Sequence, residues 1–286
     1  MKSAFLIMAH SNFDMLKLLV TQLDYKDNDI YIHIDKKCGN VDYGQFETLT
    51  KYSKVYCLRD RMKVTWGSCS QIKLELKMFD AAFNNSGGGQ RYDYFHLISG
   101  VDFPLMKNQD MSQFLEENDG AEYIGMVNAK NVIEQRLGCW HFYTDRNLWG
   151  KLYRHIVIPL QKVLKIHHIR DFTNYRLGPN WCTVSSSLVG SLLKEKDDIV
   201  KRYRYSFCCD EVFLQTFVFE HKEFLQKIYC PHDQYKSCMR YIDFKRGRPY
   251  TFHVDDISEL LQADRFFARK VDKATMLGLK KHLNDS

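Results

Sequence analysis

The chain has 286 residues, of which 45% are apolar and 27% charged, and its formal net charge is +6. This composition is ordinary for a globular protein and excludes disordered and low-complexity classes. No apolar run approaches the ~20 residues that a membrane-spanning helix needs. The nine cysteines show neither a Cys-x-x-Cys pair nor zinc-type spacing. We expect a cytoplasmic protein with reduced cysteines, and the positive charge favours an anionic partner.

The N-terminal region has the pattern of a strand, a helix and a second strand. Residues 4–9 form a continuous apolar run, typical of a buried parallel strand, and His10 follows. An amphipathic helix is predicted over 13–23 and a second strand over 30–34, which ends at Asp35. In open α/β sheets such strand ends form the ligand crevice. Because no glycine-rich phosphate loop is present, a nucleotide would be bound by side chains such as Asp35.

Two further strands are predicted, with a helix between them. The strands are expected at 54–58 and 94–98, and the helix begins at Ser68 or Ser70. The second of these strands leads into a loop, 99–105, in which Gly100 permits unusual backbone angles. This loop is either a functional loop at a strand end or a plain turn.

The segment 146–170 is strongly basic and rich in apolar residues. It contains six Lys or Arg residues and no acid. One interpretation is an amphipathic helix that lies on an anionic membrane surface. The alternative is a helix that packs one face on the core and exposes the other to solvent.

Two adjacent carboxylates open an otherwise apolar stretch at 206–218. Asp210 is at the position of a helix N-cap, which would place Glu211 in the first helical turn. The pair is either a cap or contains a general base at the mouth of a buried helix. Further along, basic clusters at 245–248 and 265–270 flank a helix predicted over 256–263. They form either a diphosphate clamp or ordinary surface charge.

Several segments match one family in order and in approximate spacing. They lie at residues 9–16, 32–37, 97–105, 210–216 and 267–270. On these motifs the chain resembles glycosyltransferase family 14, which comprises core-2/I-branching β-1,6-N-acetylglucosaminyltransferases and peptide O-xylosyltransferases, and in particular its bacterial-type members. The resemblance runs from about residue 3 to residue 272.

The resemblance implies a fold and a reaction. The fold is α/β and GT-A-like, with a Rossmann-like mixed sheet flanked by helices in a single domain of residues 1–286. Residues 1–105 would form the nucleotide-binding half and residues 106–286 the acceptor and catalytic half. The reaction is an inverting transfer from a UDP-sugar, with GlcNAc the first expectation, to a hydroxyl of a glycan, glycoprotein or lipid-linked acceptor. Transfer of xylose, or of a hexose such as glucose or galactose, from its UDP-sugar is the alternative.

The resemblance also implies residue roles. Glu211 matches the general base. The expected UDP-sugar-binding residues are His10, Asp35, Ser99, Gly100, Asp102, Arg246, Arg248 and Lys270, with Arg246 preferred to Arg248 for the diphosphate. The candidates for acceptor binding are Glu134, Arg136, Trp181 and Asp210.

No metal or other cofactor is expected. The only Asp-x-Asp motif, at 27–29, precedes a strand and is interpreted as a turn. The family's metal-free chemistry points the same way. Partners are expected to be the donor and the acceptor, with possible peripheral membrane contact through 146–170 at the inner face of the cell membrane, and no nucleic acid.

Two other classes of function fit the sequence less well. A glycoside hydrolase needs two carboxylates facing each other across a sugar, about 5 Å or 6.5–9.5 Å apart. Asp210 and Glu211 are sequence neighbours, and adjacent helical residues do not face each other. A non-catalytic carbohydrate-binding module would explain the aromatic residues but not an acid, an Arg and a Lys at matching positions.

Overall fold

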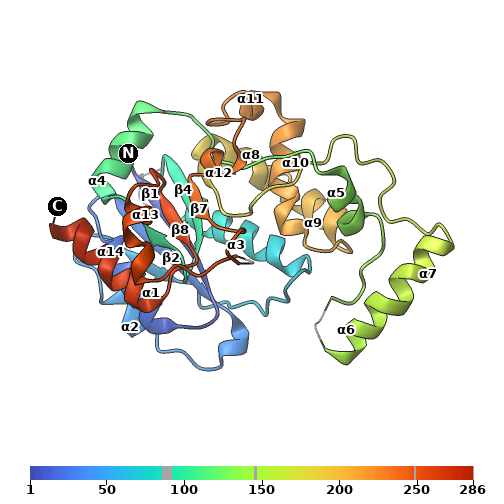
Figure 1. The fold of residues 1–286 in the computed structure, drawn as a ribbon, viewed down its shortest axis with the longest axis horizontal. Coiled ribbons are helices and arrows are strands. Elements are labelled where there is room, and N and C mark those ends of the chain that lie inside the picture. The colour runs from blue at the N-terminus through green and yellow to red at the C-terminus, as the bar shows by residue number, and fades with distance from the viewer. Residues whose placement is uncertain (86–91, 145–146, 248, 286) are drawn as a thin grey trace.

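The computed structural model describes residues 1–85, 92–144, 147–247 and 249–285 (Figure 1). Its centre is a five-stranded sheet of order β3-β2-β1-β4-β6. Neighbouring strands are parallel except for the β4–β6 pair, which is antiparallel. The strands are β1 (Ser3–Ala9), β2 (Asn28–Ile34), β3 (Val55–Cys57), β4 (Tyr94–Ser99) and β6 (Thr183–Ser185).

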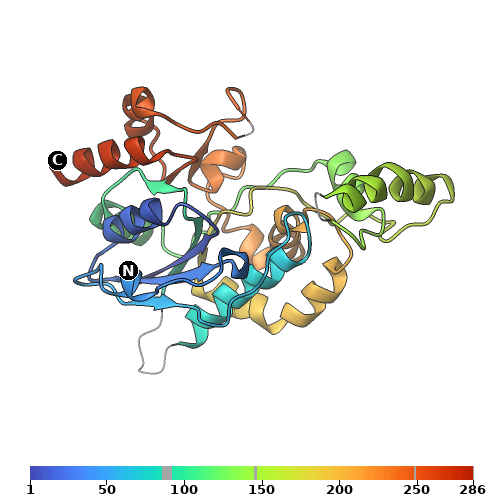
Figure 2. The same ribbon diagram turned by 90° about the horizontal axis from the view of Figure 1, so that it is seen from below.

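Helices cover both faces of this sheet, and the alternation along β1 explains why. Phe5 and Ile7 belong to one buried cluster, and Ala4 and Leu6 belong to another on the opposite face. The first cluster includes residues of α1 (Phe13–Gln22) and α14 (Lys273–Asp285), and the second includes α3 (Ser70–Asn84), α8 (Ser186–Lys194) and α10 (Phe213–Glu220). Figure 2 shows the two helical layers on either side of the strands.

A second, three-stranded sheet joins the C-terminal part of the chain to the end of β4. Its order is β5-β8-β7, with β5 (Phe103–Pro104), β8 (Phe267–Arg269) and β7 (Arg240–Ile242). Val271 N donates to Val101 O at 3.1 Å, just beyond β8. This pairing brings the residues that follow β8 to the loop that follows β4.

The remaining helices are short. They are α2 (Gly44–Glu47), α4 (Asn108–Glu117), α5 (Lys130–Leu137), α6 (Leu148–Leu152), α7 (Ile158–Val163), α9 (Lys196–Tyr203), α11 (Lys222–Leu225), α12 (Gln234–Ser237) and α13 (Ile257–Leu261). In the described part of the chain, single 3₁₀ turns lie at Lys36–Cys38, Cys209–Glu211 and Val254–Asp256, and a π-turn lies at Tyr153–Val157.

The segment from α6 through the π-turn to α7 forms one rod that projects from the body of the molecule (Figures 1 and 2). Throughout the described residues, no helix combines the length and the apolar character needed to cross a bilayer.

The α/β class with a largely parallel sheet is confirmed, and the predicted strands and helices of the N-terminal half lie within a few residues of their expected bounds. One local prediction is wrong. Asp210 is not a helix N-cap, because it lies in the 3₁₀ turn Cys209–Glu211, and α10 begins only at Phe213 after Val212. Its carboxylate is directed instead at α3, where Gln71 Nε2 donates to it at 2.7 Å.

Candidate active site

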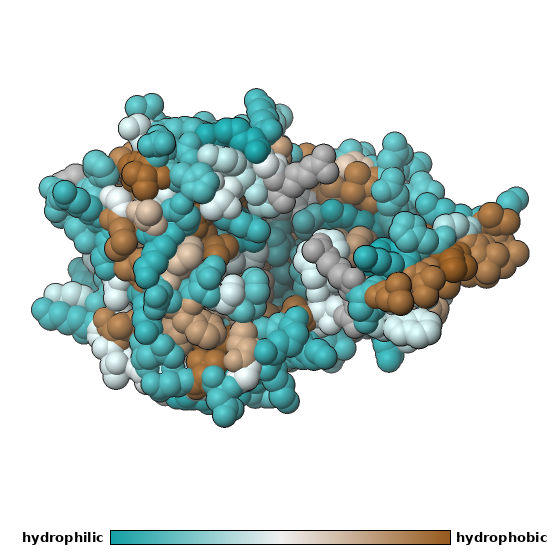
Figure 3. All heavy atoms as spheres, turned by 60° about the horizontal axis from the view of Figure 1, so that its bottom comes forward, coloured by the Kyte–Doolittle hydropathy of each residue, from teal (hydrophilic) through white to brown (hydrophobic). Residues whose placement is uncertain are grey.

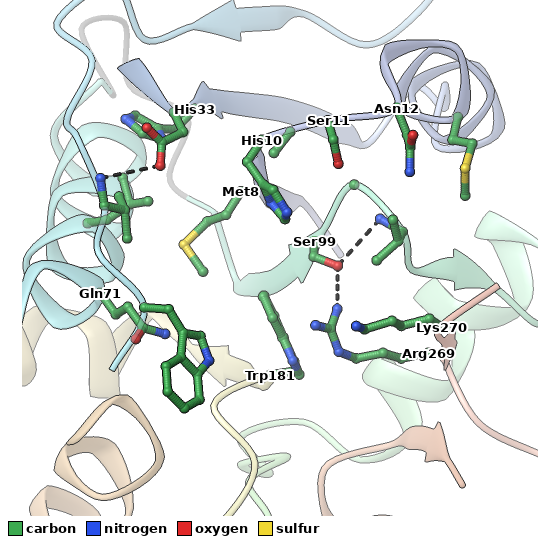
Figure 4. A pocket seen from close by; sticks show the side chains of 18 of the residues that line it. Met8, His10, Ser11, Asn12, His33, Gln71, Ser99, Trp181, Arg269 and Lys270 are labelled. Carbon is green, nitrogen blue, oxygen red and sulfur yellow. Dashed lines mark hydrogen bonds between the residues drawn. The ribbon is translucent and has the colours of Figure 1, made fainter. Parts of the chain in front are cut away.

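A cavity of about 570 Å³ lies at the carboxyl ends of β1, β2 and β4. Five of the predicted donor-binding residues line it, and Trp181, predicted for the acceptor, lines it too (Figure 4). These five are His10, Asp35, Ser99, Gly100 and Lys270. The structure therefore brings together residues that are up to 260 positions apart in the sequence, as expected for the crevice of an open α/β sheet.

One wall of the cavity is formed where β1 and β2 end. The buried Asp35 carboxylate accepts hydrogen bonds from Lys37 N at 2.8 Å and Val64 N at 3.3 Å, which fix its orientation. Burial lowers the pKa of His33 to about 4, and its Nε2 accepts from Met62 N at 2.9 Å. His33 is consequently neutral at physiological pH and contributes shape and hydrogen bonding rather than charge.

The opposite wall carries two adjacent cations, Arg269 and Lys270, at the end of β8 (Figure 4). Arg269 Nη1 donates to Asp102 Oδ1 at 2.6 Å and to Ser99 Oγ, and its Cζ lies 4.2 Å from the centre of the Trp181 ring. Asp102 is fully buried and also accepts from Ser99 N at 2.8 Å. Asp102 therefore lies beneath the cavity and orients Arg269.

Lys270 differs from Arg269 in having a free charge. Among the residues that the structure describes, no carboxylate lies within 4.0 Å of its ammonium group. Burial lowers the pKa of Lys270, and the neighbouring Arg269 adds to the effect. An anionic ligand would favour the charged form of Lys270 and so offset both effects, which makes this wall suitable for a phosphate group.

Arg246 does not reach the cavity. Its exposed guanidinium is bound by three carboxylates, Asp243 at 2.5 Å, Asp256 at 2.7 Å and Glu259 at 2.8 Å. Arg248 lies outside the described residues.

Arg269 was not predicted as a donor-binding residue from the sequence, although it stands beside Lys270 in the motif at 267–270. Its signal was the pair of cations directly after an apolar strand.

The two carboxylates at 210–211 have different environments. Asp210 is buried and accepts from Gln71, which lines the cavity. Glu211 is 41% exposed, and its Oε2 lies 2.6 Å from Nη2 of Arg136. Its backbone carbonyl accepts from Gly178 N at 2.9 Å, two residues before the cavity-lining Asn180. Glu211 thus stands beside the cavity, with its carboxylate oriented by Arg136.

Of the four residues predicted to bind the acceptor, one lines the cavity, one forms an ion pair with Glu211 and two do neither. Trp181 lines the cavity, and Arg136 contacts Glu211. Glu134 is exposed on α5 and does not line the cavity. Asp210 is shielded by burial, so it acts on its neighbours rather than on a bound acceptor.

A second buried acid lies below Asp210. Burial raises the pKa of Asp210 to about 7, and the charge of Glu211 adds to this, while Arg136 opposes it. Burial also raises the pKa of Glu75, and the charge of Asp210 contributes. Glu75 Oε1 accepts from Asn180 Nδ2 at 3.4 Å. Near neutral pH these two acids therefore share fewer than two negative charges.

The raised pKa of Asp210 predicts a pH-dependent stability. The protonated form is favoured by folding, so its contribution is complete below pH ~4 and is lost as the pH rises through about 7. In Asp210→Asn the side chain stays neutral. The variant should therefore gain free energy of unfolding relative to wild type between pH 4 and 8, by at most about 4 kcal/mol.

Urea titrations at several pH values measure this difference. Asp197→Asn, a change at an exposed position of α9, is the matched control and should show no such trend. A constant difference between Asp210→Asn and wild type across the range would refute the buried-acid interpretation.

Comparisons with known proteins show which family the chain belongs to. A family model described as "Core-2/I-Branching enzyme" matches residues 3–264. Xylosyltransferase 2 of Rattus norvegicus and of Homo sapiens are each 23% identical over 293 residues, covering 94% of this chain and 32% of the relative. The chain thus spans about a third of the length of these curated relatives.

A solved structure, mouse xyloside xylosyltransferase 1 in its apo form, aligns over 93% of this chain and 96% of its own. Its TM-score is 0.38 and its sequence identity 11%. The family match covers most of the chain, including the five strands of the central sheet and the Asp210-Glu211 pair, and it ends just before β8. The chain therefore belongs to the Core-2/I-branching enzyme family of glycosyltransferases.

Proposed function

We propose that this glycosyltransferase transfers a sugar from a UDP-sugar to a hydroxyl of a glycan, glycoprotein or lipid-linked acceptor, with inversion. The observation that carries the proposal is the cationic wall formed by Arg269 and Lys270 at the carboxyl ends of the sheet. The cavity, about 570 Å³, has the size of typical small-ligand sites.

The donor's orientation follows from the charges of the two walls. The diphosphate binds Arg269 and Lys270, and the nucleoside binds toward His10 and the fixed Asp35 carboxylate. A planar guanidinium and a point-charge ammonium suit a diphosphate well. Ser99 supports Arg269 from below. We propose that these two cations stabilise the leaving group and that no metal is required.

The transfer step is a single displacement. The acceptor oxygen attacks the anomeric carbon, the bond from that carbon to the diphosphate breaks, and UDP leaves with the electron pair. Glu211 takes the proton of the acceptor hydroxyl. Arg136 orients the Glu211 carboxylate at 2.6 Å, and the Trp181 ring, which lines the cavity beside Arg269, contacts the sugar.

We consider two sugars as the group that is transferred. GlcNAc is the first expectation, in agreement with the branching enzymes after which the family is named. Xylose is the second candidate, because the curated relatives that match this chain are called xylosyltransferases. A panel of UDP-sugars tested for turnover distinguishes the two.

The base assignment predicts the behaviour of Glu211→Gln. Transfer should fall by about 10²–10⁴-fold, because the amide cannot take a proton. Affinity for UDP should stay within about twofold, since Glu211 does not line the cavity. Transfer is measured as UDP release with acceptor and affinity by calorimetry.

Glu220→Gln is the matched control for this variant. It also removes a carboxylate paired with an arginine, Arg202 at 2.9 Å, but at the other end of α10. Its turnover should equal that of wild type. Normal transfer by Glu211→Gln would eliminate Glu211 as the base.

The diphosphate assignment predicts different effects at Lys270 and Arg246. Lys270→Met keeps the length of the side chain but removes a charge aimed at the ligand, so the Kd for UDP should rise about 10- to 100-fold. Arg246→Met removes a charge that is already bound by three carboxylates, and the Kd should change by less than about threefold. Calorimetric titration of UDP measures both, and the reverse order of effects would show that Arg246 holds the diphosphate.

A further inference from the structure

The rod formed by residues 148–163 has an exposed apolar stripe along its length. Trp149 is 70% exposed, Leu148 69% and Val163 78%. Further exposed apolar side chains along the rod and just after it are Leu152, Ile156, Leu160, Leu164 and Ile166. Figure 3 shows these residues as a hydrophobic ridge on the projecting part of the molecule. Contiguous exposed apolar surface of this kind marks an interaction site.

The inward side of the rod is attached to the body by hydrogen bonds from Gln161 and Tyr153. Gln161 Oε1 accepts from Trp140 N at 2.8 Å, and its Nε2 donates to Trp140 O at 3.0 Å. Tyr153 Oη donates to the same carbonyl at 2.7 Å. A surface helix of a globular protein normally turns its apolar face inward. On this rod the inward side includes the partly buried Val157 and Ile158, but the longer apolar stripe is exposed and directed away from the protein.

Basic residues border the stripe. Between residues 147 and 170 the chain has five Lys or Arg residues and neither Asp nor Glu. Lys151, His155 and Lys162 recur at spacings of four and seven, which places them on one line of the helix, and all three are exposed. Each is next in sequence to an apolar residue of the stripe, about 100° away around the axis. The exposed surface thus joins an apolar band to a positive band.

We propose that the rod lies flat on the surface of an anionic phospholipid bilayer. The apolar stripe enters the boundary between headgroups and acyl chains, and Lys151 and Lys162 contact lipid phosphates. The charge argues for lipid over a second copy of this chain, because two identical basic faces would repel each other. This inference is independent of the sugar and the reaction proposed above.

Co-sedimentation of the full chain with vesicles tests the proposal. The protein should pellet with phosphatidylcholine vesicles that contain about 30% phosphatidylglycerol and should remain largely in solution with phosphatidylcholine alone. Ile156→Glu/Val163→Glu should lower the partition coefficient at least about tenfold. Lys151→Glu/Lys162→Glu should do the same for anionic vesicles.

Two controls keep the outcomes distinct. Leu277→Glu, at a 49% exposed position of α14, should bind vesicles like wild type, and circular dichroism verifies that every variant is folded. Absence of binding to anionic vesicles by folded wild type would overturn the proposal, and so would unchanged binding by Ile156→Glu/Val163→Glu. A wild-type dimer in sedimentation velocity that this double variant converts to monomer would show that a second copy covers the stripe instead.

Discussion

The ion pair between Asp102 and Arg269 is the contact on which the site depends. It connects the loop after β4 in the main sheet to the end of β8 in the small sheet, across 167 sequence positions. Asp102 is fully buried; Ser99 N donates to its Oδ2, and Ser99 Oγ donates to Oδ1, the oxygen that also accepts from Arg269. Loss of one partner from a buried pair of this kind costs about 3–5 kcal/mol. The pair therefore fixes both the packing of the two sheets and the position of the cationic wall.

Helix α3 has the corresponding role on the other side of the cavity. Gln71 in its first turn lines the cavity and bonds Asp210, and Glu75 one turn later accepts from Asn180. The segment 209–211, which lacks a side-chain cap, is thus held by Gln71 of α3 and by Arg136 of α5. Burial of Asp210 and Glu75 beside the cavity lowers the stability of the folded protein. Buried acids with raised pKa values are common at functional sites.

Much of the fold could be predicted from the sequence, because its signals are local. Continuous apolar runs such as 4–9 indicate buried parallel strands, and the polar residue after each run, His10 or Asp35, lies at the cavity as expected. Local patterns could not show which arginine, Arg246 or Arg269, lies at the cavity and is able to bind a phosphate. Arg246 looks like a phosphate ligand in sequence, and only the tertiary structure shows that Asp256 and Glu259 bind it.

Two other features were also beyond local patterns. The cap position of Asp210 was predicted from residue type, but the left-handed backbone at Cys208, with φ of 44°, leads into a 3₁₀ turn instead. The basic amphipathic character of 146–170 was recognised, yet the sequence does not state which face turns inward. That face is decided by the contacts of Gln161 and Tyr153 with Trp140.

We propose above that Arg269 and Lys270 bind the donor diphosphate without a metal. Calorimetric titration of the wild-type protein with UDP and with uridine, both in the presence of a chelator, tests it most directly. UDP should bind at least about tenfold more tightly than uridine, because only UDP reaches the two cations. Equal affinities, or UDP binding that appears only when Mn²⁺ is added, would contradict it.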